Sequence, residues 1–569
     1  MPDINKIDLV QKLAEYDLTI YPLNALKNQA TSYTIGIIQP LEDVIANDYE
    51  VRNSDTQSIT LKYNNFFQKL FTDQRELVLS PEYSCPWQIL SAQFDNNFPA
   101  RGVLWIIGCE SISIDNLKQF INENEEKVKF IFEDLDQLDS LGDRHFLDPI
   151  LYCFNATYSD GTNKKIVVIQ FKRRPMVDHV LELEKDHLIF GTKYYELRND
   201  DTSTRLITLI CAESIDYDLE LEPQKAYIIP HLQLNTKPFH SSFMDYRLDT
   251  FKRNKNIEII CVNWAKGFKI NGRAESLYGG SAYYLHSSKI KVDDTRINDN
   301  HKKGVYYSYS TAQHYHRFTL NYEQHIFYLK SNPILQDQTA NINQSRFGIE
   351  AIKVFHWELN SWNECTNCDD KWQEKLNNLG YFNRVSFLSA CSPIAKERFL
   401  NITTGVNLSK IKWYSPQNLK SFHFNSDENP SKLSVFFNPN NQQNLNNITG
   451  KVNWLKRNIL NQDIEYPDRF LDLQVVTDFS VTENYKESHI NIRNGESCAT
   501  FVGLGNDSEI EAKKVFTNIA NAIEDAQRKL IVWYEDDDRN ILNYCEENNK
   551  IDADFTENKN SITNDRDGE

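Results

Sequence analysis

One apolar run of the chain ends in a cysteine: LITLICAE, residues 206–213. Two similar runs upstream end in other reactive groups, LVLSPE in Glu82 and IVVIQFK in Lys172. Short runs that are apolar throughout and rich in branched residues predict strands that are buried on both faces. Because polar residues at the ends of such strands gather at one edge of a sheet, we expect Glu82, Lys172 and Cys211 to meet there.

A carboxylate, an ammonium and a thiol together suit acyl transfer through a covalent thioester. Only the thiolate attacks readily, so Cys211 needs a base to take its proton. Glu82 can take that proton and return it to the leaving group. Lys172 can hold the ion pair together and neutralise the oxyanion of the intermediate. Since none of the thirteen histidines follows a strand in a suitable context, a Cys-His arrangement is not predicted.

Length and composition limit the class of protein. A chain of 569 residues predicts two or three domains, and 40% hydrophobic with 25% charged residues is typical of a soluble protein. The net charge of −18 argues against a nucleic-acid binder. No apolar stretch is long enough for a membrane span, and no secretory signal is evident. Ten scattered cysteines, mostly in apolar runs, favour the reducing cytoplasm.

Residues 33–330 alternate β-rich runs with amphipathic ones, which predicts a layered α/β fold. Helices are expected at 58–72, 86–95, 115–126 and 241–254, and a closing hairpin of two strands at 315–330. The first twenty residues have the pattern of a surface helix. Strands are expected at 33–39, 77–80, 103–109, 150–158, 165–171, 206–211, 226–230, 257–263 and 281–286.

The remaining chain is divided by composition. We expect one domain over residues 1–330, a Gln- and Asn-rich linker over 331–345, and an α+β domain of unknown fold over 346–545. Within that domain, 355–378 is predicted to be helical, 433–437 a strand, 438–447 an exposed loop, 508–528 a helix and 529–534 a strand. The acidic tail 546–569 has almost no apolar residues and is expected to be disordered.

The order glutamate, lysine, cysteine, each after its own strand, resembles the nitrilase, or carbon–nitrogen hydrolase, superfamily. Three further marks add to the resemblance: Gln39-Pro40 after the first strand, Asn263 with Gly267 after a late strand, and Gly279-Gly280-Ser281 after that. The resemblance covers residues 30–330. It implies an α-β-β-α sandwich, a homo-oligomer, a small-molecule amide or nitrile substrate, and neither cofactor nor metal.

The resemblance also implies a second glutamate between lysine and cysteine. Glu182 is the first candidate and Glu184 the alternative, because the family's Lys-x-His-Leu is replaced here by Lys172-Arg173-Arg174-Pro175. After the nucleophile, nitrilases typically have tryptophan and glutamate, and amidases an aromatic residue and aspartate. Ala212-Glu213 therefore leaves nitrile and amide both open. The expected substrate contacts are Tyr83, Ala212, Glu213 and Asn263.

Other motifs have weaker functional interpretations. Cys365-x-x-Cys368 supplies two ligands where structural zinc takes four, with His356 and Cys391 as the nearest other candidates. Gly503-Leu504-Gly505 lacks the rest of a phosphate loop and is predicted to be a turn. The basic runs beside Lys172 and Lys252 are predicted to be solvated, with an anionic substrate as the alternative.

The favoured hypothesis is a cysteine-dependent hydrolase of a non-peptide amide, nitrile or carbamoyl group. Two alternatives stay open. One is a non-enzymatic interaction or sensing protein, including one in a bacterial defence system, with a protein partner bound through the C-terminal domain. The other is an acyltransferase, which would pass the same thioester to an amine.

Overall fold

The computed structural model divides into two compact units. The described residues of the first end at 365, and those of the second begin at 492. Each unit is described by itself. The described residues are 5–27, 32–139, 144–176, 182–215, 220–236, 238, 241–274, 280–286, 299–300, 303–310, 315–321, 323–331, 348–365, 492–494, 497–506, 508–520, 529–538 and 541–544. The predicted strand at 433–437, the loop at 438–447, the tail and all of the linker except Ser331 lie outside these residues.

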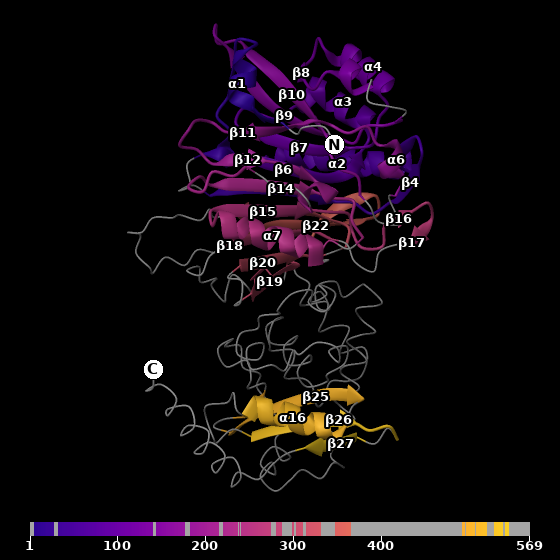
Figure 1. The fold of residues 1–569 in the computed structure, drawn as a ribbon, viewed down its shortest axis with the longest axis vertical. Coiled ribbons are helices and arrows are strands. Elements are labelled where there is room, and N and C mark those ends of the chain that lie inside the picture. The colour runs from indigo at the N-terminus through magenta and orange to yellow at the C-terminus, as the bar shows by residue number, and fades with distance from the viewer. Residues whose placement is uncertain are drawn as a thin grey trace, which may run out of the picture. The chain divides into compact units, whose positions relative to one another are not determined.

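The first unit contains a ten-stranded sheet (Figure 1). Strand β6, which carries Glu82, lies parallel to its neighbours β3 and β7, while β9 and β10 form an antiparallel pair. The order is β23 (Ser361–Glu364), β22 (Ile349–Glu358), β21 (His325–Ser331), β3 (Tyr33–Gln39), β6 (Leu77–Cys85), β7 (Leu104–Cys109), β9 (Pro149–Tyr158), β10 (Asn163–Phe171) and β8 (Lys129–Ile131), with β2 (Leu18–Ile20) beside β9.

A second large sheet of the first unit has nine strands, and Cys211 directly follows its strand β13. The order is β1 (Asn5–Asp8), β11 (Lys193–Leu197), β12 (Arg205–Ile207), β14 (Tyr227–Leu232), β15 (Ile257–Val262), β18 (Ala282–His286), β20 (Tyr315–Leu320) and β19 (Val305–Ser310), with β13 (Leu209–Ile210) beside β14. A small third sheet consists of β17 (Arg273–Ala274), β16 (Lys269–Ile270), β4 (Asp43–Asn47) and β5 (Glu50–Asn53).

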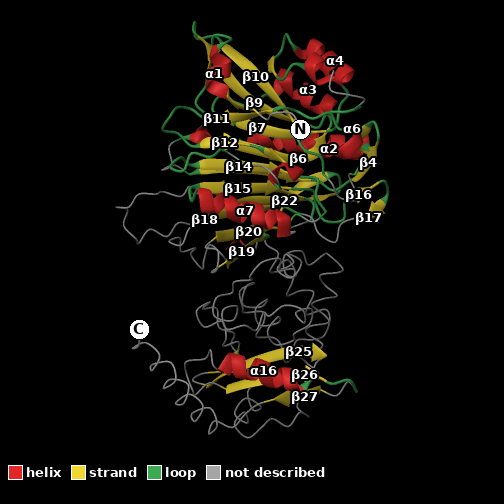
Figure 2. Ribbon diagram, viewed as in Figure 1, coloured by secondary structure: helices red, strands yellow, loops and turns green. Residues whose placement is uncertain are grey.

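Helices cover one face of each large sheet. Tyr63 and Phe66 of α2 (Thr56–Thr72) pack with Val78 and Ile107 of the ten-stranded sheet, and α3 (Trp87–Asn96) and α4 (Ile114–Asn124) join the same core. Phe251 of α7 (Ser241–Arg253) packs on the nine-stranded sheet in front of β15 (Figure 2). The α/β class is therefore confirmed. The shorter helices are α1 (Leu9–Ala14), η1 (Asn24–Leu26), α5 (Leu135–Asp139), α6 (Leu183–His187) and η2 (Cys211–Ser214).

The two large sheets also contact one another. Gln170 of β10 donates a hydrogen bond through Nε2 to the Thr208 carbonyl oxygen at 3.2 Å, and Tyr33 of β3 donates to Glu258 of β15 at 2.5 Å. All four residues are buried. Polar pairs of this kind satisfy groups that could not reach water, and they fix how one sheet lies on the other.

Strand β6 is irregular where it carries Glu82. Its pairing with β7 shifts between Ser80 and Cys85. Gly108 of β7 lies against this irregularity, and a Cβ atom there would be 2.2 Å from the Pro81 carbonyl oxygen. Only glycine permits this approach of the two backbones, so Gly108 helps to place Glu82.

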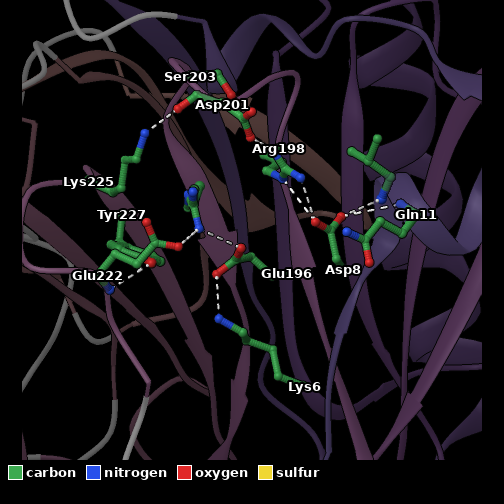
Figure 3. Close-up of polar contacts among 12 residues, drawn as sticks. Lys6, Asp8, Gln11, Glu196, Arg198, Asp201, Ser203, Glu222, Lys225 and Tyr227 are labelled. Carbon is green, nitrogen blue, oxygen red and sulfur yellow. Dashed lines mark hydrogen bonds and ion pairs between the residues drawn. The ribbon is translucent and has the colours of Figure 1, made fainter.

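The N-terminal residues do not form the expected surface helix. Helix α1 has six residues, and the strands on either side of it join different sheets: β1 pairs with β11, and β2 with β9. Figure 3 shows the ion pairs that hold β1, with Asp8 on Arg198 at 2.7 Å and Lys6 on Glu196 at 3.5 Å. The alternation of charged and apolar residues at 5–8 therefore belongs to a strand at the edge of the nine-stranded sheet and not to one face of a helix.

Two further predictions from the sequence are wrong. Residues 315–330 do not form a hairpin, because β20 pairs with β18 and β19 while β21 pairs with β3 and β22 in the other sheet. Residues 355–364 are not helical but lie in the antiparallel pair β22 and β23. The first unit thus continues past residue 330, where the sequence suggested its end.

The second unit contains a four-stranded sheet with one described helix. Strands β25 (Ser497–Asn506) and β26 (Lys529–Glu535) are parallel, with α16 (Glu509–Ala520) between them in the chain. Strands β24 (Ile492–Asn494) and β27 (Ile541–Tyr544) pair antiparallel at the two edges. The helix predicted over 508–528 is confirmed over 509–520, and residues 521–528 lie outside the described residues. The strand predicted over 529–534 is confirmed. Gly503-Leu504-Gly505 belongs to β25 and not to a turn. The helices of the described residues are all too short or too polar to cross a lipid bilayer.

Candidate active site

Both large sheets contribute to one buried cluster. Glu82 lies on β6 and Lys172 directly after β10 in the ten-stranded sheet, while Cys211 follows β13 in the nine-stranded sheet. All three side chains are completely buried. The structure therefore brings together the three residues that the sequence placed at strand ends.

Lys172 is the centre of this cluster. Its Nζ atom lies 2.6 Å from Glu82 Oε1, and 2.8 and 2.7 Å from the two oxygens of Glu184. Asp148 Oδ2 is 3.6 Å away. Burial by itself would lower the pKa of Lys172, but Glu184 and Glu82 more than offset burial and raise this pKa well above its ordinary value. The lysine is thus a fixed ammonium ion.

The second glutamate of the cluster is Glu184, not Glu182. Glu182 directly precedes helix α6 and is exposed. Glu184 lies two residues further, within the helix, and is completely buried. Glu184 also accepts hydrogen bonds from the Met176 backbone N at 2.6 Å and the Tyr83 hydroxyl at 2.9 Å. The sequence alternates Glu-Leu-Glu here, so only the start of the helix decides which carboxylate turns inward.

Asp148 is the third carboxyl group of the cluster, and the sequence analysis missed it. It is completely buried, and burial followed by the neighbouring Glu82 raises the pKa of Asp148 well above its ordinary value. The pairing of β9 and β10 sets Pro149 opposite Phe171, and the Lys172 backbone N donates to the Asp148 carbonyl oxygen at 2.8 Å. A hairpin between these two predicted strands would have placed Asp148 beside Lys172, which is the signal that could have found it.

The carboxylate of Glu82 is held at both oxygens. Oε1 accepts from Lys172, and Oε2 accepts from the Leu234 backbone N at 2.5 Å. The Glu82 carbonyl oxygen accepts from Trp264 Nε1 at 2.8 Å. Residues from three different strands or their ends therefore fix the position of this carboxylate before any substrate is bound.

Cys211 has an unusual backbone conformation. Its φ angle is +42°, and Tyr83, directly after Glu82, has a φ angle of +56°. Non-glycine residues at positive φ cost about 1–3 kcal/mol each and cluster at functional sites. His231 of β14 approaches the Cys211 carbonyl oxygen through Nε2 at 2.7 Å. Because burial lowers the pKa of His231 to about 3, the ring is neutral and must carry its proton on Nε2 to donate this bond.

The thiol of Cys211 is protonated in the resting site. Burial, followed by the Glu82 carboxylate, raises the pKa of Cys211 well above its ordinary value, and the Lys172 ammonium offsets only part of this rise. Glu82 is thus near enough to act on this pKa, while the sulfur itself lies 3.8 Å from Met176 Sδ. An attack by this sulfur therefore requires the transfer of a proton, and Glu82 is the carboxylate placed to accept it.

The neighbouring Arg173 is not a solvated surface charge. It is buried and pairs with Glu213, with Nε 2.8 Å from Oε1 and Nη2 2.5 Å from Oε2. Glu213 Oε2 also accepts from the Ile210 backbone N at 2.9 Å. This bidentate ion pair ties the residue after Lys172 to the turn that carries Cys211, and so fixes the two sheets at the cluster.

The residues expected to contact substrate lie in or next to the cluster with partners inside the protein. Glu213 is engaged by Arg173, and Tyr83 by Glu184. Asn263 pairs with the backbone of Asn235, donating at 2.8 Å and accepting at 3.0 Å. Ala212 is buried in the turn η2. Substrate contact by these four residues stays a prediction.

Three carboxylates of the cluster could hold a cation. The carboxylates of Glu82, Asp148 and Glu184 approach within 4.8 Å of one another. The ammonium of Lys172 already lies among them at 2.6–3.6 Å. The lysine is therefore the cation that these carboxylates bind.

Replacing Asp148 by asparagine is expected to change how stability depends on pH. A carboxyl whose pKa is raised in the folded state binds a proton that the unfolded state has released, so it lowers the free energy of unfolding as pH rises above about 3.8, its ordinary pKa. Asp148→Asn removes this titration and keeps nearly the same side-chain shape. Urea unfolding at pH 5 and pH 8 should show the variant gaining stability relative to the native chain at the higher pH; a constant difference would contradict a protonated Asp148.

Comparisons with known proteins gave matches among solved structures only: no family model and no curated protein matches the chain. The chain is similar to a glutamine-dependent NAD+ synthetase from Acinetobacter baumannii, at 11% identity and a TM-score of 0.30 over 53% of this chain and 46% of that one. It thus spans about half the length of that synthetase.

Two shorter proteins match over most of their length. Nit3 of Saccharomyces cerevisiae, a member of branch 10 of the nitrilase superfamily, is 12% identical with a TM-score of 0.27 over 54% of this chain and 92% of that one. The NitN amidase from Neterenkonia sp. AN1 is 11% identical with a TM-score of 0.25 over 44% and 84%.

Proposed function

We propose that this chain is a cysteine-dependent hydrolase of a non-peptide carbon–nitrogen bond, with a nitrilase-like α-β-β-α sandwich as its first domain. One observation carries the proposal: Lys172 joins Glu82 and Glu184 in a completely buried cluster that also contains the Cys211 thiol. Burying three carboxyl groups and a thiol around one ammonium costs free energy. Ionisable groups perturbed in this way cluster at functional sites. A nucleophile, a base and a fixed positive charge are the equipment for acyl transfer.

The first half-reaction forms the thioester. Glu82 takes the proton of Cys211 as the sulfur attacks the carbon of an amide, nitrile or carbamoyl group. The positive charge of Lys172 stabilises the intermediate through the network that it forms with the two glutamates. Glu82 then returns the proton to the nitrogen. With an amide or carbamoyl group, the carbon–nitrogen bond breaks and ammonia or an amine leaves. With a nitrile, the adduct is a thioimidate, and a water molecule must add to its carbon before ammonia leaves and the thioester remains.

The second half-reaction frees the enzyme. Glu82, again a carboxylate, activates a water molecule that attacks the thioester carbon. The carbon–sulfur bond breaks and the thiol regains a proton as the carboxylic acid leaves. Glu184 keeps Lys172 in place through both halves. The proposal includes a small-molecule substrate, a homo-oligomer and a cytoplasmic location.

Intact-mass measurement tests the proposal directly. The full chain is incubated with a panel of amides and nitriles and then quenched in acid, which preserves thioesters. A substrate should add the mass of its acyl group, and fragmentation should place this mass on Cys211. The acid product should appear in the same reaction.

Two results would count against the hydrolase. An acyl group found on another cysteine would remove Cys211 from the reaction. A stable acyl-Cys211 that hydrolyses no faster than a free thioester, but is discharged by an added amine, would identify an acyltransferase in place of a hydrolase.

A further inference from the structure

The pair of strands β22 and β23 brings together a second set of nucleophilic and titratable side chains, away from the buried cluster. His356 and Glu358 lie on β22, and Cys365 directly follows β23. These two strands end the order of the ten-stranded sheet. From the sequence, Cys365 and His356 were considered only as possible zinc ligands, and a helix was predicted where these two strands lie.

The three side chains form a relay. His356 Nδ1 lies 3.2 Å from Cys365 Sγ, and His356 Nε2 lies 2.9 Å from Glu358 Oε2. The Cys365 backbone N donates to the Val354 carbonyl oxygen at 2.7 Å, which fixes the thiol beside the ring. The three side chains are also accessible to solvent: the histidine is 32% exposed, the glutamate 59%, and the cysteine is half-buried.

This order of groups is that of an activated nucleophile. A base within hydrogen-bond reach takes the proton of the thiol, and a third group orients the base and stabilises its charged form. The neighbouring histidine does not oppose proton transfer from Cys365 to His356. His325 lies opposite His356 on β21, and burial lowers the pKa of His325 to about 4. His325 is therefore neutral near pH 7.

We propose that Cys365 is a second reactive thiol of this chain, activated by His356 and Glu358, and that it exchanges with small-molecule disulfides. His356 takes the proton of Cys365, and the thiolate attacks one sulfur of the disulfide. The disulfide bond breaks as the new Cys365–sulfur bond forms. The departing thiolate takes the proton from His356, so the products are a mixed disulfide and one small thiol.

A thiol-exchange site fits the geometry better than a zinc site. Structural zinc takes four ligands, and His356 and Cys365 supply two. Glu358 contacts the far nitrogen of the ring, not the side that faces the sulfur. Within the described part of the chain, the cluster around Lys172 is the one place where three ligand side chains come together. The inference does not depend on the proposed hydrolase.

The rate of thiol exchange tests the proposal on the full chain. Reaction with 5,5′-dithiobis(2-nitrobenzoate) is followed by the released coloured thiolate at pH 6.5 and pH 9. One equivalent should react in a fast phase that is absent from Cys365→Ser. At pH 6.5 an ordinary cysteine is only about 1% thiolate, so His356→Gln should slow this phase by about tenfold or more, and Glu358→Gln by less. At pH 9 the differences should shrink because the thiol ionises without help.

Controls separate this role from a structural one. His145→Gln changes another half-buried histidine far along the chain and should leave the fast phase unchanged. Glutathione disulfide should add one glutathione, which tandem mass spectrometry should place on Cys365 rather than Cys368. The proposal is overturned if the fast phase belongs to another cysteine, if His356→Gln reacts at the native rate at pH 6.5, or if the thiol reacts only after a chelator removes bound zinc.

Discussion

Cys211→Ala is expected to abolish turnover while the chain stays folded. The sulfur is the only protein atom that bonds to the substrate in the proposed mechanism, so its removal should lower kcat by at least about 10⁴-fold. Alanine keeps the Cβ atom and therefore the strained φ of +42°. Since no buried charge loses its partner, the free energy of unfolding should fall by only about 1 kcal/mol. Turnover on a substrate found by intact mass, together with urea unfolding, measures both effects.

Cys211→Ser is the matched variant. It has nearly the same shape and retains a proton for Glu82, but its hydroxyl ionises far less readily than a thiol. We expect it to be folded and inactive like the alanine variant. Native-level turnover in either variant would show that another residue is the nucleophile, whereas loss of folding would mean that the test had reported stability instead of chemistry.

The sequence predicted the parts of the fold that follow from local pattern. Strands that are apolar on both faces, such as 33–39 and 257–262, were found within one residue of their ends. The order of the reactive residues along the chain was enough to bring Glu82, Lys172 and Cys211 together. The single sheet edge behind this prediction does not hold, however, because Cys211 follows a strand of the other large sheet.

Predictions that needed to know which strand pairs with which were less successful. Strands β20 and β21 are separated by four residues, a spacing typical of a hairpin, yet they belong to different sheets. The turn between them is held by Gln39, whose Nε2 donates to the Asn321 and Glu323 carbonyl oxygens at 2.7 and 2.6 Å. Such a contact over 280 residues has no local signal.

In the candidate site, too, local pattern was enough for some residues, whereas others depend on contacts between distant parts of the chain. Glu184 was distinguished from Glu182 only by the start of a five-residue helix, and Asp148 only by the register of β9 and β10. Arg173 looked like part of a solvated basic run because its partner Glu213 is 40 residues away. Charge balance in a buried cluster depends on these distant partners, so the sequence could identify the nucleophile but not its complete surroundings.

Lys172→Met is expected to remove activity and to destabilise the first unit. Methionine has a similar length and no charge, so Glu82, Glu184 and Asp148 would remain buried without their shared cation. Breaking a buried ion pair in this way costs about 3–5 kcal/mol. The carboxyls would respond by binding protons that the unfolded chain releases, which makes the loss of stability grow as pH rises. Urea unfolding at pH 5 and pH 8 should therefore show the larger deficit at pH 8.

Lys62→Met is the matched control. Lys62 is also buried, but it pairs with a single carboxylate, Glu42, and donates to the Leu41 carbonyl oxygen at 2.8 Å. Removing Lys62 leaves one carboxyl group near the surface without its cation, whereas removing Lys172 leaves three in the interior. The loss of stability should therefore be smaller and less dependent on pH. Turnover should stay intact. Equal losses in the two variants, or a Lys172→Met protein that turns substrate over, would show that the cluster is not organised around the charge of this lysine.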